Sequence, residues 1–338
     1  MAAGRMPAPV PAPADVLLVS LGSTGGLRAA DAELAGAMRR AGARVDVRVA
    51  RAQRDVRTLA LTDLIWARAA RAAARAGLEG PAPRAVLYST ITAALLGPTP
   101  GAIRFDAIAA ANRPGRHGIW QRPAERWRLR AAPLLVPWSP DGLREAGLEG
   151  RRAVVVPVPI QPSGAAPGAG SPQRDLAAIT YAADPEKKGL DRVLDAWEQI
   201  RRPGESIAVC GTDRVPPGEG IQRLGRLERN DFRALLRRAR AFVIAPRRED
   251  YGLVQLEALA DGARLVTSEG PGPYVALELA RALDPALVGD DLAGALRRAI
   301  DAGPDDYATR AAALLAPYRS PAIDRVVAER LLPALLGS

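Results

Sequence analysis

Cysteine, histidine and lysine are nearly missing from this chain of 338 residues, which has one cysteine, one histidine and two lysines. A single cysteine, Cys210, excludes a disulfide framework, so we expect a reducing, cytoplasmic setting. With His117 as the lone histidine, no His/Cys set is available for a metal site. We therefore expect no metal ion and no cofactor, and we interpret Cys210 as a small core residue at the end of a strand.

Long hydrophobic runs are also missing. The first apolar stretch is interrupted by Pro7, Pro9, Pro11, Pro13 and Asp15, so it makes a poor signal peptide. No uninterrupted apolar run reaches the ~18 residues needed to span a bilayer. The length instead predicts two domains, each large enough to bury a core.

The scarcity of lysine makes the two that remain informative. Ala, Arg, Gly and Pro are abundant, as in GC-rich bacterial coding, where basic surface positions become arginine. Lys187 and Lys188 nevertheless stand side by side in ADPEKKGLDRVLDAW, residues 183–197, just ahead of an expected helix. Two readings remain open: a functional pair, or two lysines at a solvated helix start.

Charge is unevenly distributed along the chain. Residues 1–165 carry 23 arginines against 12 acidic residues, a net charge of +11, while the remainder is close to neutral. This excess suggests an anionic partner on the first half, such as phospholipid, nucleic acid or a phosphorylated acceptor. The alternative is an arginine-rich surface that only keeps the protein soluble.

Residues 112–130 concentrate arginine and tryptophan. The segment contains Arg113, Arg116, Arg122, Arg126, Arg128 and Arg130 with Trp120 and Trp127. Arginines beside tryptophans suit peripheral contact with an anionic membrane, where Arg116, His117 and Trp120 would lie on the acceptor or membrane side. Single-stranded nucleic acid would fit the same composition but is the partner we do not favour. The remaining alternative is a helix with buried tryptophans and solvated arginines.

Apolar runs alternate with helix-period segments throughout, which predicts parallel sheets covered by helices. In the first half we expect strands at 15–22, 44–49, 84–89, 102–106, 133–139 and 152–159, and helices at 27–42, 62–77, 120–131 and 140–146. In the second half we expect strands at 176–182, 206–211, 241–246 and 264–268, and helices at 188–200, 228–239 and from 252.

Residues 161–172, QPSGAAPGAGSP, contain only small, polar or turn-forming residues and are interpreted as an interdomain linker. We expect a first domain at 1–160, the linker at 161–173, a second domain at 174–320, and a C-terminal helix at 321–338 that packs back towards the first domain. The expected fold is α/β, with two facing Rossmann-like domains and a ligand cleft between them.

Two glutamates in AFVIAPRREDYGLVQLEALADGARLVTS border one expected pocket. Glu249 lies in the loop and Glu257 within the helix that begins near Gly252. The free backbone amides of Gly252 and Leu253 would form a seat for an anion, and glycine allows close approach of a ligand. Carboxylates accept hydrogen bonds from sugar hydroxyls, so the pattern favours a ligand with both hydroxyls and phosphates.

The second half resembles the retaining glycosyltransferases of family 4, which have the GT-B fold. The resemblance rests on E-x7-E, on the following EALADGARLVTS, and on the KKG helix start. The matching residues are Glu249, Tyr251, Gly252, Leu253, Glu257, Ala258 and Gly262. In the first half, LGSTGGLRAADAELAGAMRRAGARVDV is similar to the family's glycine-rich turn and first helix.

The resemblance implies a role for each of these residues. Lys188 would hold the donor diphosphate and Lys187 would be only solvated, while Glu257 would bind the donor ribose and Glu249 the transferred sugar. Tyr251, Gly252 and Leu253 would complete the donor site, with Gly25 and Gly26 as a backbone wall near the phosphates. A lysine ammonium stabilises a leaving diphosphate without a metal. Alone, the turn at 22–26 is no P-loop, because it lacks the G-K-[S/T] ending.

Two positions depart from the family pattern. The family's second diphosphate contact, an arginine six residues before the lysine, is replaced by Ala182. An arginine from elsewhere would have to substitute, and Arg28, Arg247 and Arg248 are candidates. Asp106 stands where the family has an acceptor-side histidine, and we expect it to position the acceptor.

These observations predict a metal-independent retaining glycosyltransferase that uses a nucleotide-diphospho-sugar and an unidentified acceptor hydroxyl. A phosphorylase or hydrolase-like use of the cleft is the enzyme alternative, but phosphorolysis usually needs a lysine-bound cofactor for which neither lysine is placed. The rival from another class is a catalytically silent scaffold subunit with the same fold, motivated by Ala182 and Asp106.

Overall fold

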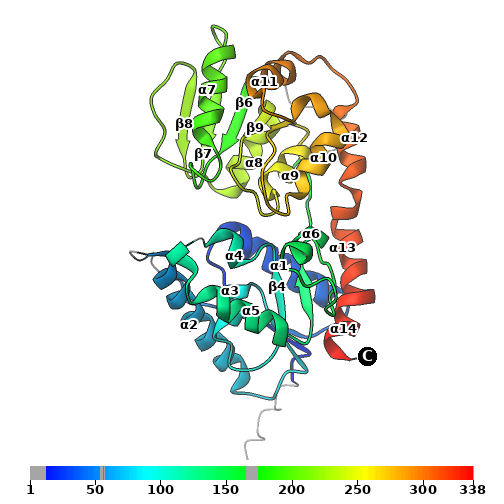
Figure 1. Cartoon of the computed structure of the whole chain (residues 1–338). Coiled ribbons are helices and arrows are strands. Elements are labelled where there is room, and N and C mark those ends of the chain that lie inside the picture. The colour runs from blue at the N-terminus through cyan, green and yellow to red at the C-terminus, as the bar shows by residue number, and fades with distance from the viewer. Residues whose placement is uncertain (1–12, 54–55, 57, 114, 165–173, 338) are drawn as a thin grey trace, which may run out of the picture.

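The computed structural model describes residues 13–53, 56, 58–113, 115–164 and 174–337. Two α/β domains are stacked in Figure 1, and a C-terminal helical segment runs alongside both of them. Each domain contains one sheet of five parallel strands, as the alternation of apolar runs and helix-period segments predicts.

The first domain is built on a sheet with strand order β2-β1-β3-β4-β5. Its strands are β1 (Val16–Ser20), β2 (Val45–Val49), β3 (Ala85–Tyr88), β4 (Ala102–Phe105) and β5 (Leu135–Pro137). Its helices are α1 (Gly25–Arg40), α2 (Leu59–Leu78), α3 (Ile91–Leu95), α4 (Ala109–Asn112), the 3-10 helix η1 (Gly115–Gly118), α5 (Gln121–Ala131) and α6 (Pro140–Glu145). The strand β1 is buried along its whole length, because helices cover both faces of a parallel sheet.

The second domain has strand order β10-β9-β6-β7-β8. Its strands are β6 (Leu176–Tyr181), β7 (Ile207–Cys210), β8 (Ile221–Gly225), β9 (Ala239–Ile244) and β10 (Arg264–Thr267). Its helices are α7 (Leu190–Ile200), α8 (Arg229–Arg238), α9 (Leu253–Ala260), α10 (Val275–Leu283), η2 (Pro285–Leu287), α11 (Leu292–Asp301) and α12 (Tyr307–Leu314).

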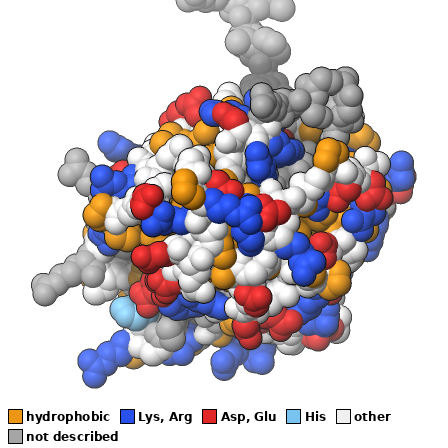
Figure 2. All heavy atoms as spheres, turned by 90° about the horizontal axis from the view of Figure 1, so that it is seen from above, with side chains coloured by type: hydrophobic (Ala, Val, Ile, Leu, Met, Phe, Trp, Pro, Cys, Tyr) orange, Lys and Arg blue, Asp and Glu red, His pale blue; other side chains and the backbone are white. Residues whose placement is uncertain are grey.

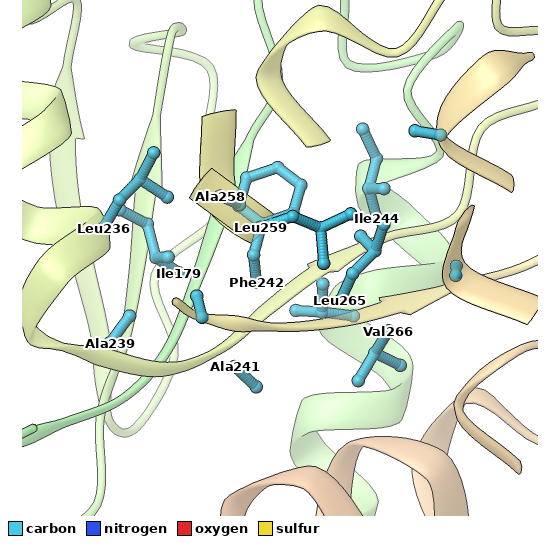
Figure 3. Packing of buried hydrophobic residues seen from close by; sticks show 14 of the residues in the cluster. Ile179, Leu236, Ala239, Ala241, Phe242, Ile244, Ala258, Leu259, Leu265 and Val266 are labelled. Atoms are coloured by element: carbon cyan, nitrogen blue, oxygen red, sulfur yellow. The ribbon is translucent and has the colours of Figure 1, made fainter. Parts of the chain in front are cut away.

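The core of the second domain joins the central strands to the helices that flank them. Figure 3 shows Phe242 of β9 close to Ile179 of β6 and to the α9 residues Ala258 and Leu259, with Ile244 on the other side of Leu259. Phe242 is completely buried and Leu259 is 2% exposed. This packing fixes α9, which carries Glu257 of the E-x7-E motif, against the middle of the sheet.

Two strand predictions need correction. Residues 152–159 form no named strand. They contain an isolated bridge from Ala153 to Leu135, and the amides of Val154 and Val156 donate to the carbonyls of Leu135 and Pro137 in β5. The pairing ends there, because the next amide on this side, that of Val158, donates to the Tyr251 hydroxyl instead. Conversely, the edge strand β8 was missed because its sequence, IQRLG, has few apolar residues and its middle is exposed.

The C-terminal segment returns from the second domain to the first. After η3 (Ala316–Tyr318) come α13 (Ser320–Val326), the π-helix η4 (Val327–Leu331) and α14 (Leu332–Leu336). Ile323, Val327 and Leu331 are buried in one cluster with Leu34 and Met38 of α1. The segment therefore covers one face of the first domain, as Figure 1 shows in red.

The chain crosses between the domains at two places that are bonded to each other. The amide of Ile160 donates to the carbonyl of Tyr318 at 2.8 Å, and Gln161 Nε2 donates to Ser320 Oγ at 2.8 Å. Residues 161–164, expected to be unable to pack, are thus partly tied down, and Ser163 donates through its amide to Asp261 Oδ1 at 2.7 Å. Residues 165–173 of the expected linker lie outside the described residues.

Candidate functional site

A cavity of about 1170 Å³ lies between the two domains, lined by residues of both. In each sheet the strand order reverses beside the first strand, between β1 and β3 and between β6 and β9. The segments that follow these strands supply cavity residues, among them Leu21, Thr90, Ala183 and Asp250. The cavity therefore occupies the place where doubly wound sheets bind ligands, beyond the carboxyl ends of their strands.

The start of α9 forms part of the cavity wall through Leu253 and Glu257. Gly252 caps the helix with a φ of 89°, a left-handed conformation that favours glycine. A Cβ on Gly252 would lie 2.7 Å from the Ala276 Cβ, so packing also requires glycine. The first amides of α9 keep the orientation that makes a helix N-terminus attractive to anions.

Glu249 is held by a buried network next to this helix start. Its Oε2 accepts hydrogen bonds from Lys188 Nζ at 2.6 Å and from Gln255 Nε2 at 2.7 Å. Glu249 is 5% exposed and Gln255 1%. Neither Glu249 nor Lys188 lines the cavity, but the neighbouring Lys187 and Asp250 do. The structure thus brings Lys188 and Glu249 together as an ion pair immediately beside the cleft.

Lys187 was expected to be only solvated, but its side chain links the two domains. Its Nζ donates to Asn112 Oδ1 at 3.0 Å and to Asp250 Oδ2 at 2.5 Å. Asn112 also donates to Asp250 Oδ1 at 3.0 Å. Burial would raise the pKa of Asp250, but Lys187, Asn112 and Arg248 together outweigh that effect, and the pKa lies below its ordinary value.

Glu257 lies between the cavity and two arginines of α8. It forms an ion pair with Arg229, and Arg233 Nη1 lies 3.5 Å from its Oε1. Burial raises the pKa of Glu257 above the ordinary value, although both arginines act in the opposite direction. A buried carboxylate with cationic neighbours can accept hydrogen bonds from hydroxyls that enter the cavity.

Of the three arginines considered as substitutes at Ala182, only Arg28 lines the cavity. Arg247 pairs with Asp191 at 2.6 Å, and Arg248 with Glu145 at 2.8 Å. Ala182 itself is buried in a small apolar cluster.

Arg226 is a cavity cation that the motif did not indicate. It lines the cavity, is exposed, and lies close enough to Tyr181 to affect its pKa. Arg226 directly follows β8. Because β8 was not predicted, Arg226 was not recognised as a residue at the carboxyl end of a strand.

Tyr251, expected among the donor-binding residues, packs between the domains instead. Its ring meets Trp138 of the first domain edge-on, with centroids 5.3 Å apart. Its hydroxyl accepts a hydrogen bond from the amide of Val158 at 3.3 Å. Tyr251 is 3% exposed and does not line the cavity, so its side chain contributes to interdomain packing in this structure.

First-domain residues that were expected to lie at the site do line the cavity. Gly25 and Gly26 line it at the start of α1, whose Thr24 side chain accepts a hydrogen bond from the Leu27 amide. Asp106 also lines it, directly after β4. Burial and the negative charge of Asp250 raise the pKa of Asp106.

A second group of cavity residues was missed altogether. Asp63 of α2 and Gln121 and Glu125 of α5 line the cavity, and Arg113 pairs with Asp63 at 2.9 Å. Both oxygens of Glu125 accept from the Ala109 amide, and burial raises its pKa to about 7. These residues were missed because the arginines of α5 suggested a surface helix, whereas Gln121 and Glu125 of the same helix line the cavity.

Arg116, His117 and Trp120 are not among the cavity residues. Arg116 and His117 of η1 are exposed, and Trp120 is half-buried, with its Nε1 donating to the Ala60 carbonyl at 3.1 Å. Trp127 and Ile119 are 60% and 69% exposed. In the view of Figure 2, Lys/Arg and Asp/Glu side chains are intermixed over the face turned to the viewer.

Comparison with known proteins decides the architecture. The solved sucrose-phosphate synthase from Thermosynechococcus elongatus superimposes with a TM-score of 0.67, over 96% of this chain and 99% of that one, at 15% identity. Alr3699/HepE of Anabaena, in complex with UDP and glucose, gives a TM-score of 0.67 over 94% of this chain and 98% of that one, at 16% identity. The fold is GT-B.

The sequence of the second domain agrees with this fold. Residues 167–302 match the family Glycosyl transferases group 1. WaaG, a glycosyltransferase involved in lipopolysaccharide biosynthesis, gives a TM-score of 0.60 over 96% of this chain and 100% of that one, at 15% identity. No curated protein matches the chain by sequence. The GT-B fold and the family match together support a glycosyltransferase.

The described residues contain neither a cluster of metal-ligating side chains nor a helix that could span a membrane. No three His, Cys, Asp or Glu side chains in the described ranges are grouped as a metal site would require. None of the described helices combines the length and the apolar character of a membrane span.

Proposed function

We propose that this GT-B protein is a metal-independent retaining glycosyltransferase of the family 4 type, which transfers a sugar from a nucleotide-diphospho-sugar to an acceptor hydroxyl. The Lys188–Glu249 ion pair at the start of α9 carries the proposal. It joins the two groups that the reaction needs, a cation for the leaving diphosphate and a carboxylate for the sugar. The family match over residues 167–302 supports the same assignment.

Lys188 and the first amides of α9 would stabilise the diphosphate. Lys188 Nζ already has one charged partner, Glu249, and an ammonium has three donors, so it can bind a phosphate oxygen as well. Arg28 and Arg226, both lining the cavity, would supply the second cationic contact in place of the arginine that Ala182 replaces. Fixed positive charge near a leaving diphosphate lowers the barrier in proportion to the charge that develops there.

The two glutamates would have separate roles. Glu257, which lines the cavity within α9, would accept hydrogen bonds from the ribose. Glu249, held by Lys188 and Gln255, would contact the transferred sugar. Asp106 would position the acceptor from the opposite wall.

In this reaction the bond between the anomeric carbon and the diphosphate oxygen breaks, and a bond to the acceptor oxygen forms on the same face. The acceptor proton passes to the departing phosphate oxygen, and the pair of electrons of the broken bond stays on the diphosphate. No cofactor takes part. We place the protein in the cytoplasm of a bacterium, with the basic first domain able to reach the inner face of the membrane.

A screen of sugar nucleotides tests the donor class. Alr3699/HepE was solved with UDP and glucose, so UDP-sugars come first, followed by ADP- and GDP-sugars. A donor at 100 times its dissociation constant should stabilise the protein by about 2.7 kcal/mol in thermal unfolding. The purified chain should also release nucleoside diphosphate slowly in water, and the anomeric configuration of a transfer product, read by NMR, reports retention.

The scaffold alternative makes the opposite prediction. A silent subunit would leave every sugar nucleotide uncleaved, even where thermal unfolding shows that the nucleotide binds. Slow hydrolysis of one donor, lost in Lys188→Met, excludes the scaffold. Cleavage that survives the loss of both Lys188 and Glu249 would contradict the proposed chemistry.

A further inference from the structure

Arg233 of α8 is a buried cation behind the second-domain wall. It is 5% exposed and is not among the cavity residues. Its Nε donates to Asp261 Oδ2 at 2.6 Å, and its Nη2 donates to the Gln161 carbonyl at 2.8 Å. Its Nη1 lies 3.5 Å from Glu257 Oε1. The guanidinium therefore connects a carboxylate of the cavity to the C-cap of α9 and to the chain that crosses between the domains.

The other partners of Arg233 hold it at a distance from Glu257. At 3.5 Å, Nη1 is close enough to compensate the carboxylate charge, but the separation is longer than a normal N–H···O bond, about 2.7–3.2 Å. A guanidinium is planar and rigid, so the contacts of Nε and Nη2 fix Nη1 as well. Asp261 is itself held, because the amide and hydroxyl of Ser163 donate to its Oδ1 and Oδ2 at 2.7 and 2.9 Å.

Glu257 keeps one oxygen for a ligand. Its Oε1 pairs with Arg229, whose side chain is 50% exposed and lines the cavity. Its Oε2 accepts no hydrogen bond from the described residues and is accessible to solvent. Arg229 can turn into solvent when a ligand enters, whereas the buried Arg233 stays in place. Glu257 thus combines a permanent cationic neighbour with a free acceptor on the cavity side.

We propose that Arg233 is a positioning residue for ribose recognition, which compensates the charge of Glu257 without occupying the oxygen that accepts from the ribose, and that Asp261 keeps it at that distance. This inference rests on the proposed function, which assigns the ribose to Glu257 but gives Arg233 and Asp261 no role. Recognition of the ribose hydroxyls then depends on two residues that do not line the cavity.

A pair of nucleotides isolates the contact at Glu257. UDP and 2′,3′-dideoxy-UDP differ only in the ribose hydroxyls, so the ratio of their dissociation constants, which we call the ribose selectivity, reports on those hydroxyls alone. Calorimetry on the full-length protein measures both constants. The wild type should bind UDP on the order of 10-fold more tightly or better, because hydrogen bonds to a charged acceptor are the stronger ones. If another sugar nucleotide gives the largest thermal shift, its nucleoside diphosphate and dideoxy form replace this pair.

Two substitutions of Arg233 test its role. Arg233→Met should lower the ribose selectivity roughly 5-fold or more, because Glu257 loses its buried cation. Arg233→Lys keeps a buried charge, which protects folding, but a point charge cannot hold three partners in one plane, so the ratio should fall several-fold. Arg238→Met, on the same helix and in an exposed pair with Asp175, is the matched control and should leave the ratio unchanged. A merely structural role would weaken both nucleotides together and leave the ratio alone.

Asp261 tests the arrangement behind Arg233. Asp261→Asn keeps the shape of the side chain but removes the charge that holds Nε, so the guanidinium should move onto Glu257 and compete with the ribose. The ribose selectivity should fall several-fold. In the Arg233→Met background the same substitution should have no further effect, because two residues that act through one contact are not additive. Thermal unfolding of each variant checks its fold.

The outcomes separate this inference from the proposed function. If no nucleoside diphosphate binds and no sugar nucleotide is hydrolysed, both the proposed function and this inference are wrong. If a nucleotide binds and its sugar nucleotide is hydrolysed, but the wild type shows no ribose selectivity or both Arg233 variants keep it, only this inference is overturned. An equal effect of Asp261→Asn with and without Arg233 also overturns it.

Discussion

The first-domain wall of the cleft does not share the net charge of its domain, whereas the second-domain wall does. Residues 1–165 carry an excess of 11 positive charges, yet their wall presents Asp63, Asp106 and Glu125 against only Arg28 and Arg113. The second half is close to neutral, and so is its wall, where Lys187, Arg226 and Arg229 accompany Glu228, Asp250 and Glu257. A domain's net charge describes mainly its solvated surface and its long-range field. The chemistry of a cavity depends instead on a few side chains and on their partners.

Lys188 gives the strongest test of the second-domain wall. Lys188→Met should lower kcat about 100- to 1000-fold, because a fixed charge at the leaving group is lost. Lys187→Met is the matched control and should lower it only several-fold, since Lys187 links Asn112 and Asp250. Steady-state kinetics on the two variants, with thermal unfolding to check the fold, makes the comparison. Equal losses would show that neither lysine has a special position at the diphosphate.

The two glutamates sharpen the same comparison. Glu249→Ala should mainly lower kcat, about 100-fold, because its contact with the sugar strengthens in the transition state. Glu257→Ala should mainly raise the donor KM, about 10-fold, because the ribose does not react. Free nucleoside diphosphate should lose affinity for Glu257→Ala and keep it for Glu249→Ala, measured by calorimetry.

The exposed Glu198 of α7 provides the control, Glu198→Ala, which should leave both constants unchanged. A reversed pattern in the two glutamate variants would mean that the two roles are exchanged. If neither substitution changed kcat or KM, the two glutamates would have only a structural role.

Much of the fold could be predicted from local patterns, because buried parallel strands are continuous apolar runs. β8 was not predicted, because it is an edge strand in which Gln222 and Arg223 are exposed. Residues 152–159 are such an apolar run, but only Val154 and Val156 donate to β5, and the Val158 amide donates to the Tyr251 side chain instead. Strand prediction thus failed where burial and backbone donors, rather than composition, decide the pairing.

Candidate site residues could be predicted only from short motifs. Lys188 and Glu249 were each predicted from a separate motif, but the sequence did not predict their contact, which joins residues 61 positions apart. Gln121 and Glu125 carried no signal, because a glutamine and a glutamate in an arginine-rich helix look like surface residues. Tyr251 was predicted at the donor site from the motif, and its ring packs against Trp138 of the first domain, a contact that no local pattern indicates.

Glu125 tests the first-domain wall through pH. Its pKa is raised from 4.5 to about 7, so the folded protein binds this proton more tightly than the unfolded chain does. The free energy of unfolding should therefore fall between about pH 4.5 and pH 7, by at most about 3 kcal/mol from this group. Glu125→Gln should remove that decline, which makes the variant more stable relative to the wild type at pH 8 than at pH 5.

Urea unfolding at the two pH values measures the effect, and Glu149→Gln, at an exposed position, serves as the control. If Glu125→Gln and Glu149→Gln shift stability in parallel at both pH values, the carboxyl of Glu125 titrates normally and the wall is more solvated than its burial indicates.

A chelator should have the smallest effect of all. Turnover should be the same with and without EDTA, because Lys188 supplies the charge at the leaving group in the proposed mechanism. Rates of nucleoside diphosphate release before and after dialysis measure this directly. A loss that Mg²⁺ or Mn²⁺ restores would move the protein to a metal-dependent class.

The return of the C-terminal segment to the first domain has a consequence for biosynthesis. Domains generally fold as the ribosome releases them, the N-terminal one first. Here the apolar face of α1 around Leu34 and Met38 is covered by Ile323, Val327 and Leu331. The first domain to be synthesised therefore waits, with part of its core open to water, until residues 323–331 have left the ribosome.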